Sequence, residues 1–100
     1  MNLERRSATR YNFGGIAEVI DLDHSSELVS ITRDLSSCGV FVKTTTPFAT
    51  GTRVQVRITH SGGEAKAMGV VTDNVTATGM GIVFTEMGPN DRAIIEKWLA

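Results

Sequence analysis

The sequence predicts an all-β domain, a six-stranded antiparallel β-barrel closed by a C-terminal α-helix. Most segments between glycine-rich or polar breaks alternate apolar and polar residues with a period of two, which is typical of strands. No helical segment alternates with these strands, so a parallel, doubly wound sheet is disfavoured. Only the last dozen residues change to a helical period. One hundred residues leave room for one domain, and we place it at 1–100 with no internal boundary.

The clearest strand covers residues 53–59. Val54, Val56 and Ile58 fall on one face and polar residues fall between them, so this strand has one buried and one solvated face. Residues 60–63 form a polar, glycine-containing loop into the next strand, 65–75. These two strands are therefore predicted to form a hairpin.

Four further segments are expected to be strands because β-branched and aromatic residues are concentrated in them. They cover residues 15–21, 28–33, 40–44 and 79–84. Two glycines in the last segment indicate a bend or a close approach of another backbone.

The C-terminal residues 91–99 are predicted to form a helix. Pro89 suits a first helical turn, and Asp91 is favourable near the positive end of the helix dipole. Ile94, Ile95, Trp98 and Leu99 form one apolar stripe. A helix of about ten residues is marginal alone, so it is expected to dock on the barrel.

Charge and composition exclude several classes of protein. Ten basic residues against eleven acidic ones give a net charge of −1, which argues against a protein that binds nucleic-acid polymers or membrane surfaces. The longest apolar runs are only a few residues, so no membrane insertion is expected. A single cysteine and the absence of an apolar N-terminal segment favour the cytoplasm.

The sequence predicts no enzyme, no metal site and no cofactor. His24 and His60 lie in separate loop segments and are expected to be solvated. Cys38 has no cysteine partner and no evident activating base, so a spectator role is expected. Gly79 and Gly81 begin a nucleotide-binding pattern, but Phe84 stands where its third glycine is needed.

Three of the ten basic residues lie between positions 5 and 10, in the segment RRSATR. Guanidinium groups are flat, permanently charged forks that match phosphate oxygens and the O6/N7 edge of guanine. The alternative is a solvated basic terminus, or arginines that lie along the barrel wall. Because few apolar groups can anchor this segment, residues 1–12 are expected to form a flexible basic arm.

The segment 34–39, DLSSCG, falls between two predicted strands. Asp and Ser side chains cap their own backbone in turns, and Gly39 allows a positive φ, so the turn needs no function. A functional alternative is open, because Asp34 can accept from guanine N1–H and N2–H₂ and Ser36 can donate to a phosphate or ribose oxygen.

Together, these segments resemble the PilZ family of bacterial cyclic di-GMP receptors. Residues 6–10 match RxxxR and residues 34–39 match DxSxxG, in this order and separated by one predicted hairpin. The resemblance covers essentially the whole chain, including the last strand and the helix. It implies that cyclic di-GMP is the ligand and that the following residues bind it: Arg5, Arg6, Arg10, Asp34, Ser36 and Gly39.

The resemblance also implies roles for these residues. Arg6 and Arg10 contact phosphate and the guanine O6/N7 edge, and Arg5 assists them. Asp34 reads a guanine donor edge, Ser36 adds a hydrogen bond and Gly39 holds the turn open. Thr72 stands near the place where some members carry an aromatic residue that stacks on guanine, so this platform is expected to be absent.

Signalling is expected to proceed by ordering of the arm on the barrel, which an unidentified protein effector reads in trans. The family's outputs include motility, exopolysaccharide synthesis in biofilms, adhesion and virulence, and the sequence does not choose among them. The main alternative is a ligand-independent protein-interaction module on the same barrel. A small barrel that binds single-stranded nucleic acid is disfavoured by the net charge and the 6% aromatic content.

Overall fold

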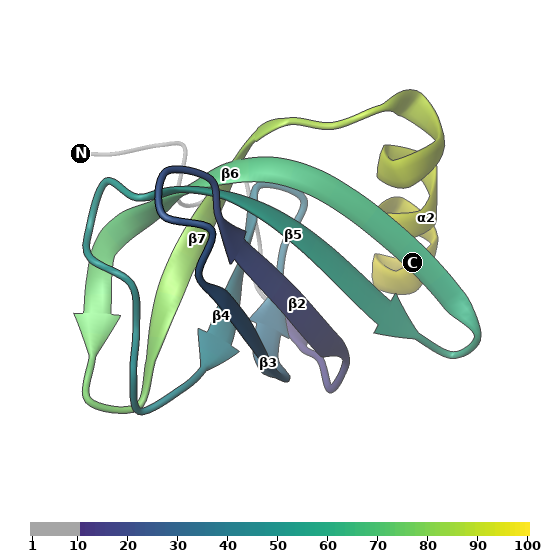
Figure 1. The fold of residues 1–100 in the computed structure, drawn as a ribbon. Helices are drawn as coiled ribbons and strands as arrows, with labels where there is room; N and C mark the ends of the chain where they lie inside the picture. Colours follow the sequence, from purple (N-terminus) through teal and green to yellow (C-terminus); the bar gives the residue numbers. More distant parts are fainter. Residues whose placement is uncertain (1–10) are drawn as a thin grey trace, which may run out of the picture.

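A computed structural model describes residues 11–100, which form strands and one C-terminal helix (Figure 1). The elements are β1 (Tyr11–Asn12), β2 (Ile16–Asp21), β3 (Glu27–Leu35), β4 (Gly39–Lys43), β5 (Arg53–His60), β6 (Gly63–Thr76), β7 (Gly79–Glu86) and α2 (Pro89–Leu99).

The strands form one antiparallel sheet in the order β1-β3-β2-β5-β6-β7-β4, and β3 also pairs with β4. This last pairing closes β2 to β7 into a six-stranded barrel. The two residues of β1 pair with β3 beyond the end of β2, through Tyr11 opposite Leu35 and Asn12 opposite Asp34. The structure therefore confirms the predicted six-stranded antiparallel barrel.

The barrel interior is filled by the apolar face of each strand. The alternation predicted for β5 is confirmed, because Val54, Val56 and Ile58 are 0–1% exposed. Val40 and Val42 contribute in the same way from β4, and both are fully buried. A close-packed interior of β-branched side chains makes the barrel a rigid support for residues on its outer face.

The helix α2 packs against β6, as predicted, and begins two residues earlier than expected, at Pro89 (Figure 1). Ile95 is its buried residue. The Asp91 carboxylate accepts a hydrogen bond of 2.9 Å from the Lys66 backbone N–H, which ties the first helical turn to β6.

Two expectations about the end of β5 were wrong. His60 is not a solvated loop residue, since it ends β5 and its ring lies 4.2 Å from that of Phe13 and 5.6 Å from that of Trp98. The predicted loop 60–63 shortens to a tight two-residue turn, in which Ser61 and Gly62 both have positive φ. This is the turn geometry that matches the twist of an antiparallel hairpin.

The N-terminal boundary also differs from the expectation. Tyr11 and Asn12, the last residues of the predicted flexible arm 1–12, are paired with β3. Two residues are too few to show an alternating pattern, so this strand could not be predicted from the sequence. Residues 1–10 lie outside the described residues, and their flexibility stays a prediction.

Candidate functional site

The turn that joins β3 to β4 is organised by the hydroxyl group of Ser36. Its Oγ accepts hydrogen bonds of 3.1 Å from the backbone N–H groups of Cys38 and Gly39. The Ser36 backbone N–H donates in turn to the Gly39 carbonyl, at 2.9 Å. Ser36 is 3% exposed, so its side chain shapes the turn from within.

Gly39 is required for a reason that differs from the one predicted. The glycines with positive φ in residues 11–100 are Gly51 and Gly62, so Gly39 is not in the left-handed region. A Cβ atom on Gly39 would lie 2.3 Å from the Ile82 carbonyl oxygen, because β4 and β7 approach closely here. Only a residue without a side chain fits this position.

Asp34 lies near the end of β3 and is 7% exposed. Its Oδ2 atom accepts a hydrogen bond of 2.8 Å from Nε of Arg33, which makes a charge-assisted pair of neighbouring residues. In the ladders, Asp34 stands opposite Asn12 on one side and Phe41 on the other. The carboxylate is therefore held in a defined position beside the turn.

Sequence reasoning missed the contact between Arg33 and Phe41. The Arg33 Cζ atom lies 3.8 Å from the centre of the Phe41 ring. Val40 and Val42 point into the core, so strand alternation places Phe41 on the outer face of β4. One valine on each side of Phe41 could have indicated this orientation. The contact of Phe41 with Arg33 of β3 could not be predicted from the sequence.

The structure thus brings Asp34, Ser36 and Gly39 together at one turn. Arg5, Arg6 and Arg10, the other predicted ligand-binding residues, lie outside the described residues. The described chain begins at Tyr11, whose pairing with Leu35 places it next to the residues of this turn.

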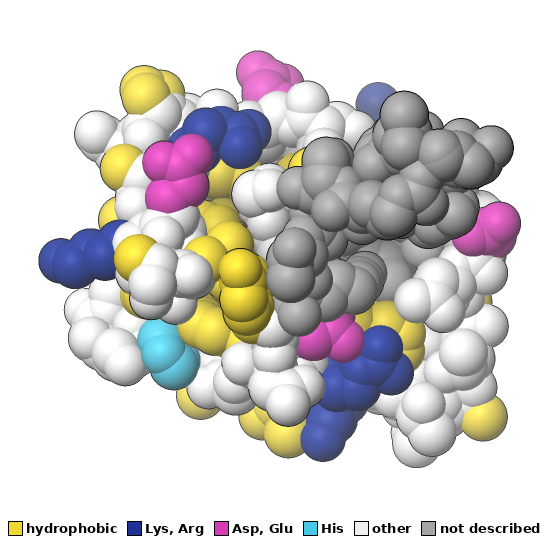
Figure 2. Space-filling model, turned by 180° about the vertical axis from the view of Figure 1, so that it is seen from behind, with side chains coloured by type: hydrophobic (Ala, Val, Ile, Leu, Met, Phe, Trp, Pro, Cys, Tyr) yellow, Lys and Arg dark blue, Asp and Glu magenta, His cyan; other side chains and the backbone are white. Residues whose placement is uncertain are grey.

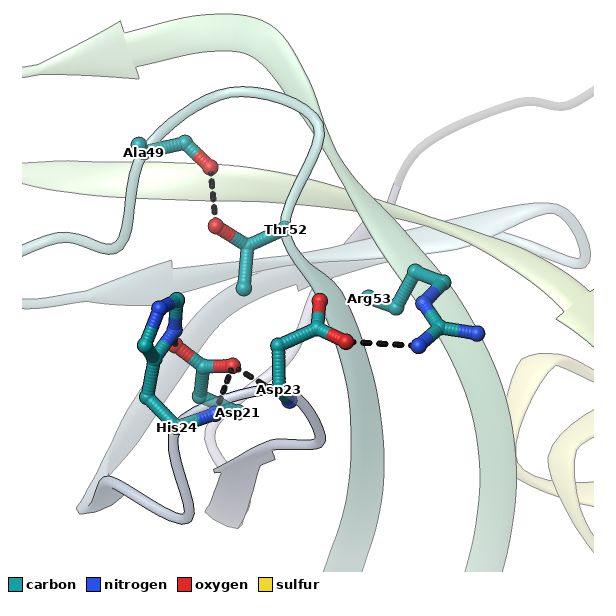
Figure 3. Close-up of polar contacts among 6 residues, drawn as sticks. All are labelled: Asp21, Asp23, His24, Ala49, Thr52 and Arg53. Atoms are coloured by element: carbon teal, nitrogen blue, oxygen red, sulfur yellow. Dashed lines mark hydrogen bonds and ion pairs between the residues drawn. The ribbon is translucent and has the colours of Figure 1, made fainter.

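A second group of polar residues lies at the turn between β2 and β3 (Figure 3). Asp21 accepts hydrogen bonds from the backbone N–H groups of Asp23 and His24, and its Oδ2 lies 3.0 Å from the His24 ring. Burial raises the pKa of Asp21, but these hydrogen bonds outweigh it and lower the pKa below its ordinary value. His24 is a solvated loop residue, as expected. The hydrogen bonds of Asp21 stabilise the turn between β2 and β3, so we assign this group a structural role.

Other kinds of site are not apparent in the described part of the chain. Residues 11–100 contain no group of three or more His, Cys, Asp or Glu side chains arranged to hold a metal ion. Two shallow grooves of about 240 and 190 Å³ lie away from the 34–39 turn, lined by residues of β5, β6 and β7, by Leu22 after β2 and by Met87 and Gly88 before α2. Over the same range, no helix has the length and apolar character needed to span a bilayer.

The outer face of the β2–β3 hairpin carries an exposed apolar patch. Ile16 and Ile31 are cross-strand partners and are 52% and 50% exposed, and Val29 is 61% exposed. Strand alternation places Val29, Ile31 and Arg33 on the same face of β3, so the patch adjoins the candidate site. Figure 2 shows hydrophobic side chains gathered on one face of the molecule, with basic and acidic side chains in contact near them.

Three solved structures share this fold. The structure of Bacillus subtilis inhibitor of motility, MotI/DgrA, matches with a TM-score of 0.75 at 15% identity over 94% of this chain and 49% of that one. The PilZ domain of CeSA from a cellulose-synthesizing bacterium matches with a TM-score of 0.71 at 21% identity, over 92% and 99%. The Borreliella burgdorferi PlzA protein, in complex with c-di-GMP, matches with a TM-score of 0.64 at 14% identity, over 85% and 32%.

The chain therefore spans about half of MotI/DgrA, a third of PlzA and nearly all of the CeSA domain. At these identities the likeness establishes the fold alone. No curated protein matches the sequence. The model of the PilZ domain family, however, matches residues 4–100, which includes every predicted site residue and all of the barrel. The chain belongs to the PilZ domain family.

Proposed function

We propose that this protein is a cytoplasmic receptor that binds cyclic di-GMP between its N-terminal arm and the turn at residues 34–39. The pairing of β1 with the end of β3 carries this proposal. Arg10 is joined by one peptide bond to Tyr11, which stands opposite Leu35. Consecutive Cα atoms are about 3.8 Å apart, so the arm is tethered within reach of Asp34.

The proposed ligand matches the chemistry of these residues. Cyclic di-GMP has two phosphodiester charges and two guanines. Arg6 and Arg10 donate charge-assisted hydrogen bonds to phosphate and to the guanine O6/N7 edge, assisted by Arg5. Asp34 accepts from the guanine N1–H and N2–H₂ groups, which adenine lacks in this arrangement. Ser36 and Gly39 support the site chiefly by holding the turn, as their contacts in the structure indicate.

Isothermal titration calorimetry with cyclic di-GMP tests the proposal, with GTP and cyclic di-AMP as controls. We expect binding of cyclic di-GMP alone, and the stoichiometry will distinguish a single ligand from an intercalated ligand dimer. Folded protein that gives no heat with cyclic di-GMP at several temperatures would refute the receptor function.

Substitution of the arginines tests the arm. Arg6→Ala and Arg10→Ala are each expected to weaken binding by about 2 kcal/mol or more, on the scale of hydrogen bonds to charged groups. Arg92→Ala, on the exposed face of α2, removes the same charge and is expected to leave the affinity unchanged. Equal affinities for the three variants would contradict a specific role of the arm.

We further propose that ligand binding orders the arm and that a protein partner reads the altered surface in processes such as motility or biofilm formation. The exposed patch of Ile16, Val29 and Ile31 beside the site favours recognition by a partner. Amide hydrogen exchange in residues 4–12 is expected to slow at saturating cyclic di-GMP. Unchanged exchange would exclude signalling by ordering of the arm.

The same patch supports a second candidate, a protein-interaction module that ignores cyclic di-GMP. The two candidates differ in a direct measurement. A module of this kind would bind its partner equally with and without the nucleotide, whereas a receptor changes its partner affinity when cyclic di-GMP is added.

A further inference from the structure

We infer that Arg33 is an additional ligand-binding residue, which stacks its guanidinium on a guanine base of the ligand. The inference rests on the proposed function, because it assigns a new residue to the same site. Its basis is the position of Arg33 between a carboxylate and an aromatic ring at the edge of the 34–39 turn.

Two contacts position the Arg33 guanidinium. Its Nε donates to Oδ2 of Asp34 at 2.8 Å, and its Cζ lies 3.8 Å from the centre of the Phe41 ring. Phe41 is 1% exposed, so the ring is a firm support and not a mobile surface side chain. Held on two sides, the flat group loses little conformational entropy when a ligand arrives.

The rest of the Arg33 side chain is available to a ligand. The side chain is 49% exposed although it covers Phe41. Its contacts with other residues of 11–100 involve Nε and the ring face, and the structure gives Nη1 and Nη2 no hydrogen-bond partner there. A planar cation with one face on a ring can receive a second π system on the other face.

The region around Thr72 offers no aromatic side chain on which a guanine could stack. Phe41 stands opposite Gly81 in the β4–β7 ladder, and a Cβ atom on Gly81 would lie 2.9 Å from Oγ1 of Thr72. The Thr72 hydroxyl donates to the Gly81 carbonyl and accepts from the Asn74 N–H. Position 72 therefore offers no ring to a base, while Arg33 presents a plane on the same outer surface, on the other side of Phe41.

Arg33 and Asp34 are neighbours that would contact different parts of the ligand. Asp34 would engage the hydrogen-bonding edge of a guanine, whereas Arg33 would lie against the face of a base. A carboxylate has two oxygens that can each accept more than one hydrogen bond, so pairing with Arg33 is compatible with contacts to a ligand.

Calorimetric titration of variants with cyclic di-GMP tests this inference. Arg33→Ala is expected to bind about tenfold more weakly than the wild type, from the loss of one desolvated cation–π contact. Arg33→Lys keeps the charge but loses the planar group, and we expect a comparable loss of affinity. Arg53→Ala removes the same charge near the other end of the barrel strands and is expected to bind like the wild type.

Each outcome decides the question. Wild-type affinity for Arg33→Ala would overturn the assignment, and wild-type affinity for Arg33→Lys would show that charge suffices and overturn the stacking role. Thermal unfolding of each variant checks the fold, and if Arg33→Ala unfolds, Arg33→Lys carries the test. Failure of the wild type to bind refutes the receptor function itself and is therefore distinguishable from failure of this inference.

Discussion

The side chain of Asp34 is nearly buried, and its carboxylate defines the proposed recognition of guanine. Asp34→Asn keeps the shape of the side chain but places an amide donor where the ligand also presents donors. We expect the affinity for cyclic di-GMP to fall by about 1.5–3 kcal/mol, measured by calorimetry.

A matched variant separates this effect from a change of net charge. Asp23→Asn removes a carboxylate that is 42% exposed and paired with Arg53 at the other end of the hairpin. It is expected to bind cyclic di-GMP like the wild type. If Asp34→Asn did the same, Asp34 would be a structural residue of the turn.

Gly39 is expected to contribute to stability because it lets β4 and β7 approach closely. In Gly39→Ala the new methyl group would meet the Ile82 carbonyl at 2.3 Å, so β4 and β7 must separate at the site. Overpacking of this kind costs about 1–3 kcal/mol, which urea unfolding would measure. Gly14→Ala is the control, because no heavy atom lies within 4 Å of its added Cβ. Equal stability of the two variants would contradict the close approach.

Some features of the candidate site could be predicted from the sequence, and others could not. The DxSxxG segment correctly predicted a turn between two strands, held by Ser36 and followed by Gly39. Asp34 lies beside this turn, in the last part of β3, and not within it as predicted. The reason predicted for Gly39, a positive φ, was wrong. The observed reason is a steric contact with β7, a strand that lies more than forty residues away in the sequence. The Arg33–Phe41 contact was missed because it forms only when β3 and β4 pair.

The turn between β2 and β3 is an element whose stability should depend on pH. The pKa of Asp21 lies below its ordinary value of 3.8 in the folded protein, so the ionised side chain stabilises the fold above that value. The contribution is lost as the pH falls through the folded pKa. We expect the free energy of unfolding to decrease below about pH 4.

Asp21→Asn should flatten this dependence, because an amide does not titrate. Denaturant unfolding between pH 2 and pH 6 is the measurement, and Asp73→Asn, at an exposed position in β6, is the control. A wild-type slope in Asp21→Asn would assign the acid sensitivity to other carboxylates.

Most elements of the fold could be predicted, for an identifiable physical reason. The strands of an antiparallel barrel have one buried face, so alternation is visible in segments such as 53–59. The helix has a different period and a proline at its start. What could not be predicted depends on tertiary contacts: the short strand β1 exists because Tyr11 and Asn12 pair with β3, and His60 extends β5 because its ring packs on Phe13 and Trp98.

At the scale of the whole molecule, the charge distribution argues against binding of a polyanion such as a nucleic acid. The net charge is −1, and several arginines of the barrel are paired with carboxylates, as Arg57 is with Glu18 and Arg53 with Asp23. A labelled single-stranded oligonucleotide is therefore expected not to bind at low salt, as followed by fluorescence anisotropy. Binding that rivals cyclic di-GMP would favour a nucleic-acid-binding barrel instead.

Closure of the sheet restricts how this protein can be recognised. Each of the six barrel strands is hydrogen-bonded on both sides, so these strands offer no open edge on which a partner could add a strand of its own. Recognition of the barrel must then use side chains, and its specificity will depend on surface residues such as Val29 and Ile31. Related barrels with different surface residues can thus share a backbone and a ligand while addressing different partners.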